Sequence, residues 1–306
     1  MHKVFQRAQQ FIYLNARPLD LTRWQYHFEN GSKEAVLNAL AYYQNEDGGF
    51  GHALEPDAWN PNSAPIQTWV ATEILREIDF TDNSHPIVQG ILNYLASGKD
   101  FNGKYWLNVI ESNKDYPHAP WWYGTKEETG HDDYNPTACL AGFIIKYANR
   151  DSTLYKLGCK LAQSAVSTYL NQGLLNNMHT VACYIRLLQY CEEAGVTDIF
   201  DIEALCRKLK EQVIYSITKA TDTWGTAYVC KPSQFITWPD SVFYPLIQEY
   251  ADFECEFILQ AQLPDGSWPV TWNWADYPEA WAVSRNWWKA DIIIKNMLYL
   301  KGFKRI

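Results

Sequence analysis

The spacing of apolar residues predicts helices along most of the chain. In the segment 34–44, apolar side chains recur at Val36, Leu37 and Leu40, which is the spacing of one face of an α-helix. Similar patterns occur in residues 66–78, 161–170, 205–217 and 286–300. An extended segment is expected only at residues 268–272, so the predicted fold class is all-α.

These helices belong to a recurring unit of helix, glycine-containing turn, irregular loop and second helix. The clearest turn is Asp47-Gly48-Gly49-Phe50-Gly51, where glycines permit the positive φ angles that end a helix sharply. Related turns occur at residues 101–106, 171–174, 222–225 and 265–268. Hairpins that cannot bury both faces alone must stack on their neighbours. We therefore expect an α/α toroid of about five to six hairpins around a central cavity, with an open superhelix as the alternative.

No linker or low-complexity segment divides the 306 residues. We expect residues 1–306 to form one domain, in which the N-terminal helical segment 1–30 packs on the ring. No apolar stretch is long enough to span a membrane, and the N-terminus lacks the apolar core of a signal peptide. The 7 cysteines are scattered without a C-x-x-C pair, which is typical of reduced thiols. These features predict a cytoplasmic protein.

Net charge and aromatic content indicate which kind of binding partner to expect. The formal net charge is −9 and no cluster of Lys and Arg occurs, so nucleic acid is not an expected partner. Aromatic residues make up 15% of the chain, and many flat rings suit the wall of a ligand cavity. A small molecule is therefore the expected partner.

The loop after the first glycine turn contains one group of candidate chemical residues. His52, Glu55 and Asp57 lie within six residues of one another. Glu55 or Asp57 would exchange a proton with a ligand, and His52 would orient the acid. The structural alternative is that Asp57 caps the next helix and Glu55 accepts hydrogen bonds from backbone N–H groups.

A second acidic group is His131-Asp132-Asp133. Adjacent carboxylates repel each other, so burial would raise the pKa of one of them and make a neutral acid available. The alternative is again a solvent-exposed cap at the start of a helix.

An acid, an aromatic residue and Asn-Pro recur in the same frame in two units, at residues 57–61 and 132–136. Because of this repetition, we also expect Trp59 and Tyr134 in the cavity wall. Asp240, which precedes Tyr244-Pro245, belongs to a looser third copy of the motif. Trp121 and Trp122 lie in a polar loop next to proline and are further wall candidates. Aromatic faces stabilise cations and also stack on sugar rings, whereas the alternative is that these rings belong to the core.

Two of the turns carry a resemblance to a known superfamily. Gln44-x-x-Asp47-Gly48-Gly49-Phe50 and Gln260-x-x-x-x-Asp265-Gly266-Ser267-Trp268 resemble the repeats of squalene–hopene cyclases and protein prenyltransferase β-subunits. The resemblance implies an α/α toroid in which Gln and the aromatic residue tie a helix to the next turn. The fold does not by itself fix the function.

The functional motifs of that superfamily are matched only in part. The Asp-x-Asp-Asp motif of class II terpene cyclases resembles His131-Asp132-Asp133, but Gly130 stands where the leading Asp belongs. The zinc ligands of protein prenyltransferases would correspond to Asp133 and Cys139, without a histidine in a matching context. We therefore expect neither a metal site nor another cofactor.

Three functions are compatible with the sequence. The first is acid–base chemistry on an isoprenoid or other apolar ligand in the central cavity. The second is a carbohydrate-active hydrolase or lyase, because paired carboxylates and tryptophans suit glycosidic cleavage. The third is a non-catalytic scaffold that binds a ligand or a protein. A dry aromatic lining would favour the first, and an open polar lining with carboxylates would favour the second.

Overall fold

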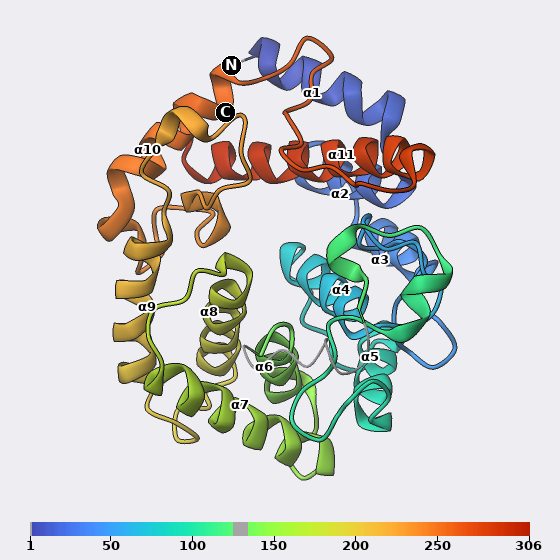
Figure 1. Ribbon diagram of the computed structural model, residues 1–306, viewed down its shortest axis with the longest axis vertical. Helices are drawn as coiled ribbons and strands as arrows, with labels where there is room; N and C mark the ends of the chain where they lie inside the picture. Colours follow the sequence, from blue (N-terminus) through green and yellow to red (C-terminus); the bar gives the residue numbers. More distant parts are fainter. Residues whose placement is uncertain (1, 125–133) are drawn as a thin grey trace. The chain divides into compact units, whose positions relative to one another are not determined.

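The computed structural model describes residues 2–124 and 134–306, in which the regular structure is helical (Figure 1). The elements in chain order are α1 (His2–Asn15), α2 (Pro18–Phe28), α3 (Lys33–Ala41), α4 (Pro65–Glu77), α5 (Pro86–Ser97), η1 (Glu111–Asp115), η2 (Pro120–Trp122), α6 (Thr137–Tyr147), α7 (Thr153–Asn171), α8 (Met178–Glu193), α9 (Ile202–Ser216), η3 (Thr221–Thr223), η4 (Pro232–Gln234), α10 (Tyr244–Gln260) and α11 (Pro278–Gly302). The described ranges contain no β-strand, and residues 268–272 are irregular. The all-α prediction is therefore confirmed.

The chain divides into two compact units. Unit 1 comprises Met1–Leu40 and Val213–Ile306, and unit 2 comprises Ala41–Gln212. Within the described ranges, no helix is long and apolar enough to cross a membrane. All 7 cysteines carry free thiols.

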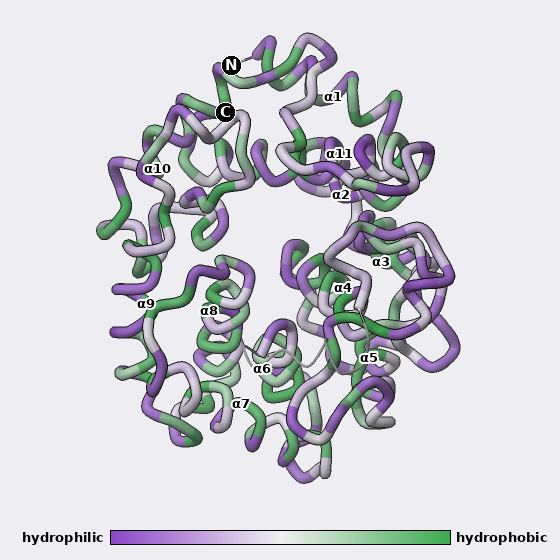
Figure 2. The backbone as a smooth tube through the Cα atoms, viewed as in Figure 1, coloured by the Kyte–Doolittle hydropathy of each residue, from purple (hydrophilic) through white to green (hydrophobic). Residues whose placement is uncertain are grey.

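Helix α6 is the centre of unit 2. Its sequence, TACLAGFIIKY, is apolar on nearly every side, and every residue except Lys146 is buried. It packs against α7 and α8, and to a smaller extent against α4. Helix α7 instead has one apolar face, and Figure 2 shows hydrophobic and hydrophilic residues alternating along it. This contrast is expected for a helix buried on all sides and one exposed to solvent.

The first glycine turn is fixed to α5. The Nε2 of Gln44 donates to the carbonyl oxygens of Gly48 (2.9 Å) and Ile87 (3.1 Å). Gly48 has a φ of +85°, and an added Cβ would lie 2.1 Å from the carbonyl oxygen of Gly90. Only glycine permits this approach of the turn to α5.

The last glycine turn repeats this geometry in unit 1. The Nε2 of Gln262 donates to the carbonyl oxygens of Gly266 (3.0 Å) and Val4 (2.9 Å), so the turn docks on α1. Gly266 has a φ of +91°, and an added Cβ would lie 2.2 Å from the carbonyl oxygen of Arg7. The expected alignment of Gln260 with Gln44 is therefore wrong, because Gln262 makes the equivalent contacts and Gln260 is still part of α10.

Threonine hydroxyls hold the aromatic residue at the end of two turns. The backbone N–H of Phe50 donates to Oγ1 of Thr68 in α4 (3.1 Å). The backbone N–H of Trp106 donates to Oγ1 of Thr137 in α6 (2.9 Å). Each contact ties a turn to the second helix of its own hairpin, and the loops between them carry the candidate site.

Unit 1 contains a buried group of charges between α2 and α11. Asp20 is completely buried and accepts hydrogen bonds from Nε of Arg17 (2.8 Å) and Nη1 of Arg23 (3.0 Å). The same Nη1 of Arg23 donates to Asp291 of α11 (3.1 Å). These ion pairs join α2 to α11.

Glu254 of α10 is another buried ionisable group of unit 1. Its carboxylate accepts hydrogen bonds from the backbone N–H (2.8 Å) and Oγ (2.6 Å) of Ser233. Burial raises the pKa of Glu254 above its ordinary value of 4.5, although Lys231 and Ser233 act in the opposite direction. A raised pKa in the folded state contributes stability that is complete below the unfolded-state pKa and lost as the pH rises through the folded-state pKa.

We therefore expect Glu254→Gln to gain free energy of unfolding relative to the wild type as the pH rises above about 4.5. Urea denaturation of both proteins at several pH values measures this difference. The exposed Glu256 is the matched control, and Glu256→Gln should show no such trend. A difference for Glu254→Gln that stays constant with pH would contradict the prediction.

Candidate functional site

The loop that follows the first glycine turn is folded back on itself. His52 and Ala53 both have a φ of +58°, and the backbone N–H of His52 donates to the carbonyl oxygen of Asn60 (3.0 Å). This reversal covers the middle of the loop, where Glu55 and Asp57 are 6% and 2% exposed. Two of the predicted acids are therefore buried.

Glu55 is held by residues from two helices. Its Oε2 accepts hydrogen bonds from the backbone N–H of Asp57 (2.9 Å) and from Nε1 of Trp122 in η2 (3.1 Å). The backbone N–H of Glu55 donates to Oε1 of Gln67 in α4 (2.6 Å). The carboxylate thus joins two loop segments that are 67 residues apart in the sequence.

The segment 107–123 is joined to this loop along its length. The N–H of Ala119 donates to the carbonyl oxygen of Asp57 (2.8 Å). Farther along, Nδ2 of Asn60 donates to Oγ of Ser112 (2.7 Å) and Oδ1 of Asn113 (2.9 Å). Asn113 in turn donates to the carbonyl oxygen of Trp122 (3.0 Å). Asn60 and Asn113 therefore fix the position of the Trp122 segment.

The end of this segment carries several aromatic side chains. Trp121 is 45% exposed and Tyr123 is 65% exposed, and the ring of His118 stacks on Tyr123 with centroids 5.7 Å apart. Trp122 is only partly buried. Exposed or partly exposed rings at the surface of a structured loop are suited to contact a ligand.

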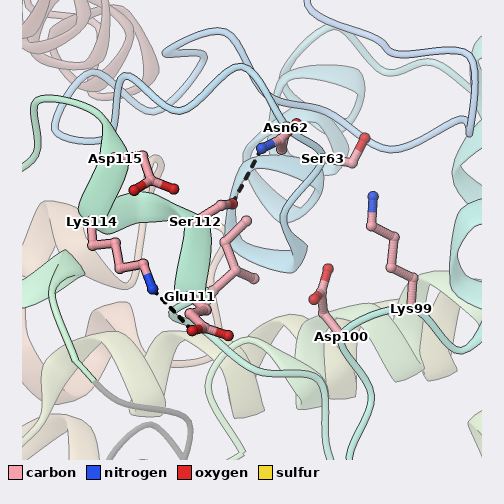
Figure 3. Close-up of a pocket in the computed structure, with 9 residues that line it drawn as sticks. Asn62, Ser63, Lys99, Asp100, Glu111, Ser112, Lys114 and Asp115 are labelled. Atoms are coloured by element: carbon pink, nitrogen blue, oxygen red, sulfur yellow. Dashed lines mark hydrogen bonds and ion pairs between the residues drawn. The ribbon is translucent and has the colours of Figure 1, made fainter.

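An open pocket of about 430 Å³ lies against the same two segments (Figure 3). This volume is within the range of small-molecule sites. The lining residues are Asn62, Ser63, Lys99, Asp100, Ile110, Glu111, Ser112, Lys114 and Asp115. All but Ile110 have polar or charged side chains, whose methylene groups also contribute apolar surface to the pocket. Lys99 and Asp100 follow α5, whereas residues 111–115 form η1, so carboxylates come from two different parts of unit 2.

The charges of the pocket are held in place by neighbours. Nζ of Lys99 pairs with Oδ2 of Asp47 in the first glycine turn (2.9 Å). Burial opposes ionisation of Asp47, but hydrogen bonds from Ser63, Lys99 and Gly49 outweigh it and lower its pKa. Nζ of Lys114 pairs with Oε1 of Glu111 (3.0 Å), and this hydrogen bond raises the pKa of Lys114. The pocket therefore offers both cationic and anionic groups.

Only some of the residues predicted for the site lie together. Glu55, Asp57 and Trp122 come together, and Trp121 and Trp59 flank them in the same segments. His52 is exposed and its Nε2 bonds to Oδ1 of Asn45 (2.9 Å), in place of the expected contact with an acid.

The other predicted site residues lie in the core, in unit 1 or outside the described residues. Tyr134 is 2% exposed and packs edge-on against Tyr105 with centroids 6.1 Å apart, so it belongs to the core. Asp240 is exposed and precedes α10 in unit 1. His131, Asp132 and Asp133 lie outside the described residues.

Asp57 does not cap the following helix. The N-cap of α4 is Ala64, which makes no side-chain cap hydrogen bond. Helix α4 begins at Pro65, which fits a first helical turn because proline lacks an N–H. The alternative interpretation of Glu55 is borne out in part, since it does accept a backbone N–H, although in a buried rather than an exposed position.

The sequence analysis missed the polar residues that make the pocket, among them Asp100, Glu111 and Asp115. Asp100 directly precedes the second glycine turn, and this position in the repeat was its only signal. Among the described residues, no group of three His, Cys, Asp or Glu side chains is placed to hold a metal ion. A comparison of the chain with protein-family models, curated proteins and solved structures found no match.

Proposed function

We propose that this protein is a carbohydrate-active enzyme whose substrate occupies the pocket of unit 2. The observation that carries the proposal is the set of polar and charged side chains that line this open pocket, among them the carboxylates of Asp100, Glu111 and Asp115 (Figure 3). Hydroxyl groups of a sugar need many hydrogen-bond donors and acceptors, which amide, hydroxyl, ammonium and carboxylate side chains supply. The exposed rings of Trp121 and Tyr123 belong to the same segment as the lining residues 110–115 and offer stacking surfaces for a sugar.

The chemistry we propose is hydrolysis of a glycosidic bond by two carboxyl groups. Asp100 follows α5, and Glu111 belongs to η1 on another wall of the pocket. One carboxyl group would protonate the leaving oxygen while the other assists the attack of water on the anomeric carbon. Glu55 is a positioning residue in this scheme, because its carboxylate holds the indole of Trp122.

For the scaffold we propose an α/α toroid related to the terpenoid cyclase and prenyltransferase superfamily. Two observations support it. Gln44 and Gln262 make the same pair of backbone contacts in their turns. The C-terminal turn also docks on α1, as the first turn docks on α5, which is the contact expected if the last hairpin is followed by the first helix in a ring.

The proposal is tested with a panel of four hexasaccharides, namely cello-, malto-, xylo- and chitohexaose. We expect at least one to bind in calorimetry and to be cleaved, as measured by chromatography of the products. Asp100→Asn and Glu111→Gln should each lower kcat by about 10²–10⁴-fold. The exposed Asp151 of unit 2 provides the control, since Asp151→Asn should retain full activity. Absence of both binding and cleavage for all four sugars would reject the proposal.

An isoprenoid ligand is the second candidate, favoured by the glutamine contacts of the two turns. Farnesyl diphosphate and squalene are therefore included in the same binding experiment. Binding of either one, with no binding of the sugars, would replace the carbohydrate proposal. Sugar binding without cleavage would instead indicate a non-catalytic scaffold.

A further inference from the structure

Asp100 has a fixed backbone directly before the second glycine turn. Its φ is +56°, a left-handed conformation that Asp and Asn tolerate better than most other residues. Its carbonyl oxygen accepts a hydrogen bond from the backbone N–H of Leu107 (2.8 Å). The side chain of Asp100 lines the pocket (Figure 3). The backbone therefore sets the point from which this carboxylate meets a ligand.

A buried tyrosine of α5 holds the carboxylate of Asp100. Tyr94 is 0% exposed, and its hydroxyl donates a hydrogen bond to Oδ2 of Asp100 (3.2 Å). A hydroxyl group that donates to a carboxylate favours the ionised form of the acid. The same hydrogen bond restricts the orientation of the carboxylate group.

Tyr94 is suited to remain a hydrogen-bond donor. Burial raises the pKa of Tyr94 above its ordinary value of 10, and the negative charges of Asp100 and Asp47 raise it further. The phenol therefore keeps its proton at neutral pH. The first glycine turn packs closely on the ring, since an added Cβ at Gly49 would lie 2.7 Å from Cδ2 of Tyr94. This packing fixes the position of the hydroxyl group.

We propose that Tyr94 is a positioning residue that keeps Asp100 ionised and oriented, so that Asp100 is the base of the carboxylate pair. Asp100 accepts a proton from water while the water oxygen bonds to the anomeric carbon. The glycosidic bond breaks, and the leaving oxygen takes a proton from the other carboxyl group, Glu111. The ion pair of Glu111 with Lys114 is exposed, so it opposes protonation of Glu111 only weakly. This inference rests on the proposed carbohydrate function.

The other charged groups around Asp100 come from three segments. They are Lys99 beside it, Asp47 of the first glycine turn, and Glu111, Lys114 and Asp115 of η1. A change confined to the hydroxyl of Tyr94 leaves all of these groups in place. A shift in the ionisation of Asp100 after such a change therefore reports the lost hydrogen bond.

The test compares Tyr94→Phe with Tyr147→Phe, and both variants keep the buried ring. Tyr147 of α6 is 5% exposed, and its hydroxyl donates to the carbonyl oxygen of Phe80 (2.7 Å), away from the residues that line the pocket. With the hexasaccharide that is cleaved best, we expect Tyr94→Phe to lower kcat about 10-fold and to leave KM nearly unchanged. The acidic limb of its pH profile should move up by about 1 pH unit, because Asp100 then ionises less readily. Tyr147→Phe should keep the profile of the wild type.

A second measurement needs no substrate. In ¹³C NMR of protein labelled at the aspartate carboxyl carbons, the signal that is absent from Asp100→Asn belongs to Asp100. The midpoint of its pH titration should lie about 1 pH unit higher in Tyr94→Phe than in the wild type. The midpoint in Tyr147→Phe should equal that of the wild type.

The outcomes separate the two proposals. If the wild type cleaves a hexasaccharide but Tyr94→Phe keeps both the pH profile and the titration midpoint of Asp100, only this inference is overturned. Equal shifts in Tyr147→Phe would also overturn it, because they would arise from a general loss of stability. If the wild type binds and cleaves none of the four sugars, the proposed function fails and the role of Tyr94 in that reaction fails with it.

Discussion

Asp20→Ala is expected to lower the free energy of unfolding by about 3–5 kcal/mol. Asp20 is completely buried and accepts hydrogen bonds from Arg17 and Arg23, which are 8% and 3% exposed. Removing the carboxylate leaves two guanidinium groups with less compensation inside the protein. Guanidine denaturation followed by circular dichroism measures the loss.

Lys295→Ala is the control within the same network. Lys295 pairs with Asp291 (2.8 Å), but its side chain is 64% exposed. Exposed ion pairs contribute about 0–1 kcal/mol because water screens the charges and the side chains lose conformational freedom. Equal losses for the two variants would show that burial does not control the contribution of this network.

Gly48→Ala and Gly266→Ala should each destabilise the protein by about 2–4 kcal/mol. Both glycines have a positive φ, and at both an added Cβ would lie less than 3 Å from a backbone carbonyl oxygen of another helix. The left-handed backbone accounts for about 1–2 kcal/mol of the loss, and displacement of the neighbouring helix accounts for the rest.

Gly98→Ala separates these two causes. Gly98 has a φ of +73°, but an added Cβ meets no atom within 4 Å. This variant should lose only the backbone contribution of about 1–2 kcal/mol. If thermal unfolding shows the same loss for all three variants, close packing of the glycine turns on α5 and α1 contributes nothing measurable.

The helices could be predicted from the sequence because their apolar period is local. The pattern in residues 66–78 corresponds to α4 (Pro65–Glu77), and that in residues 205–217 corresponds to α9 (Ile202–Ser216). The last helix was less well predicted, since α11 begins at Pro278 and not near residue 286. Its first turns combine exposed and buried residues without a clear apolar face, so the period gave no signal there.

The alignment of the two glycine turns failed for a different reason. Gln260 and Gln262 both precede Asp265, and the sequence analysis used the one that leaves four intervening residues. The spacing in the first turn, with two residues between Gln44 and Asp47, is the spacing of Gln262 to Asp265. Equal spacing is required because the glutamine must reach the carbonyl oxygen of the glycine four residues later.

The candidate site could be predicted only in its separate parts. Glu55 and Trp122 were each identified from local context, but nothing in the sequence pairs them across 67 residues. That pairing depends on hydrogen bonds of Asn60 and Asn113 between two irregular loops. Loops have no fixed period, so their mutual register follows from such specific contacts and cannot be obtained from patterns of hydrophobicity.

The division of the chain into a continuous and a discontinuous unit has a consequence for its biosynthesis. Helices α1 and α2 are translated before unit 2, yet they pack mainly on α11, which is translated after it. Unit 2, Ala41–Gln212, is continuous and is complete before the C-terminal part of unit 1 is translated. The apolar faces of α1 and α2 therefore lack their partner on the nascent chain while unit 2 is translated, and such exposed apolar surface is prone to aggregation.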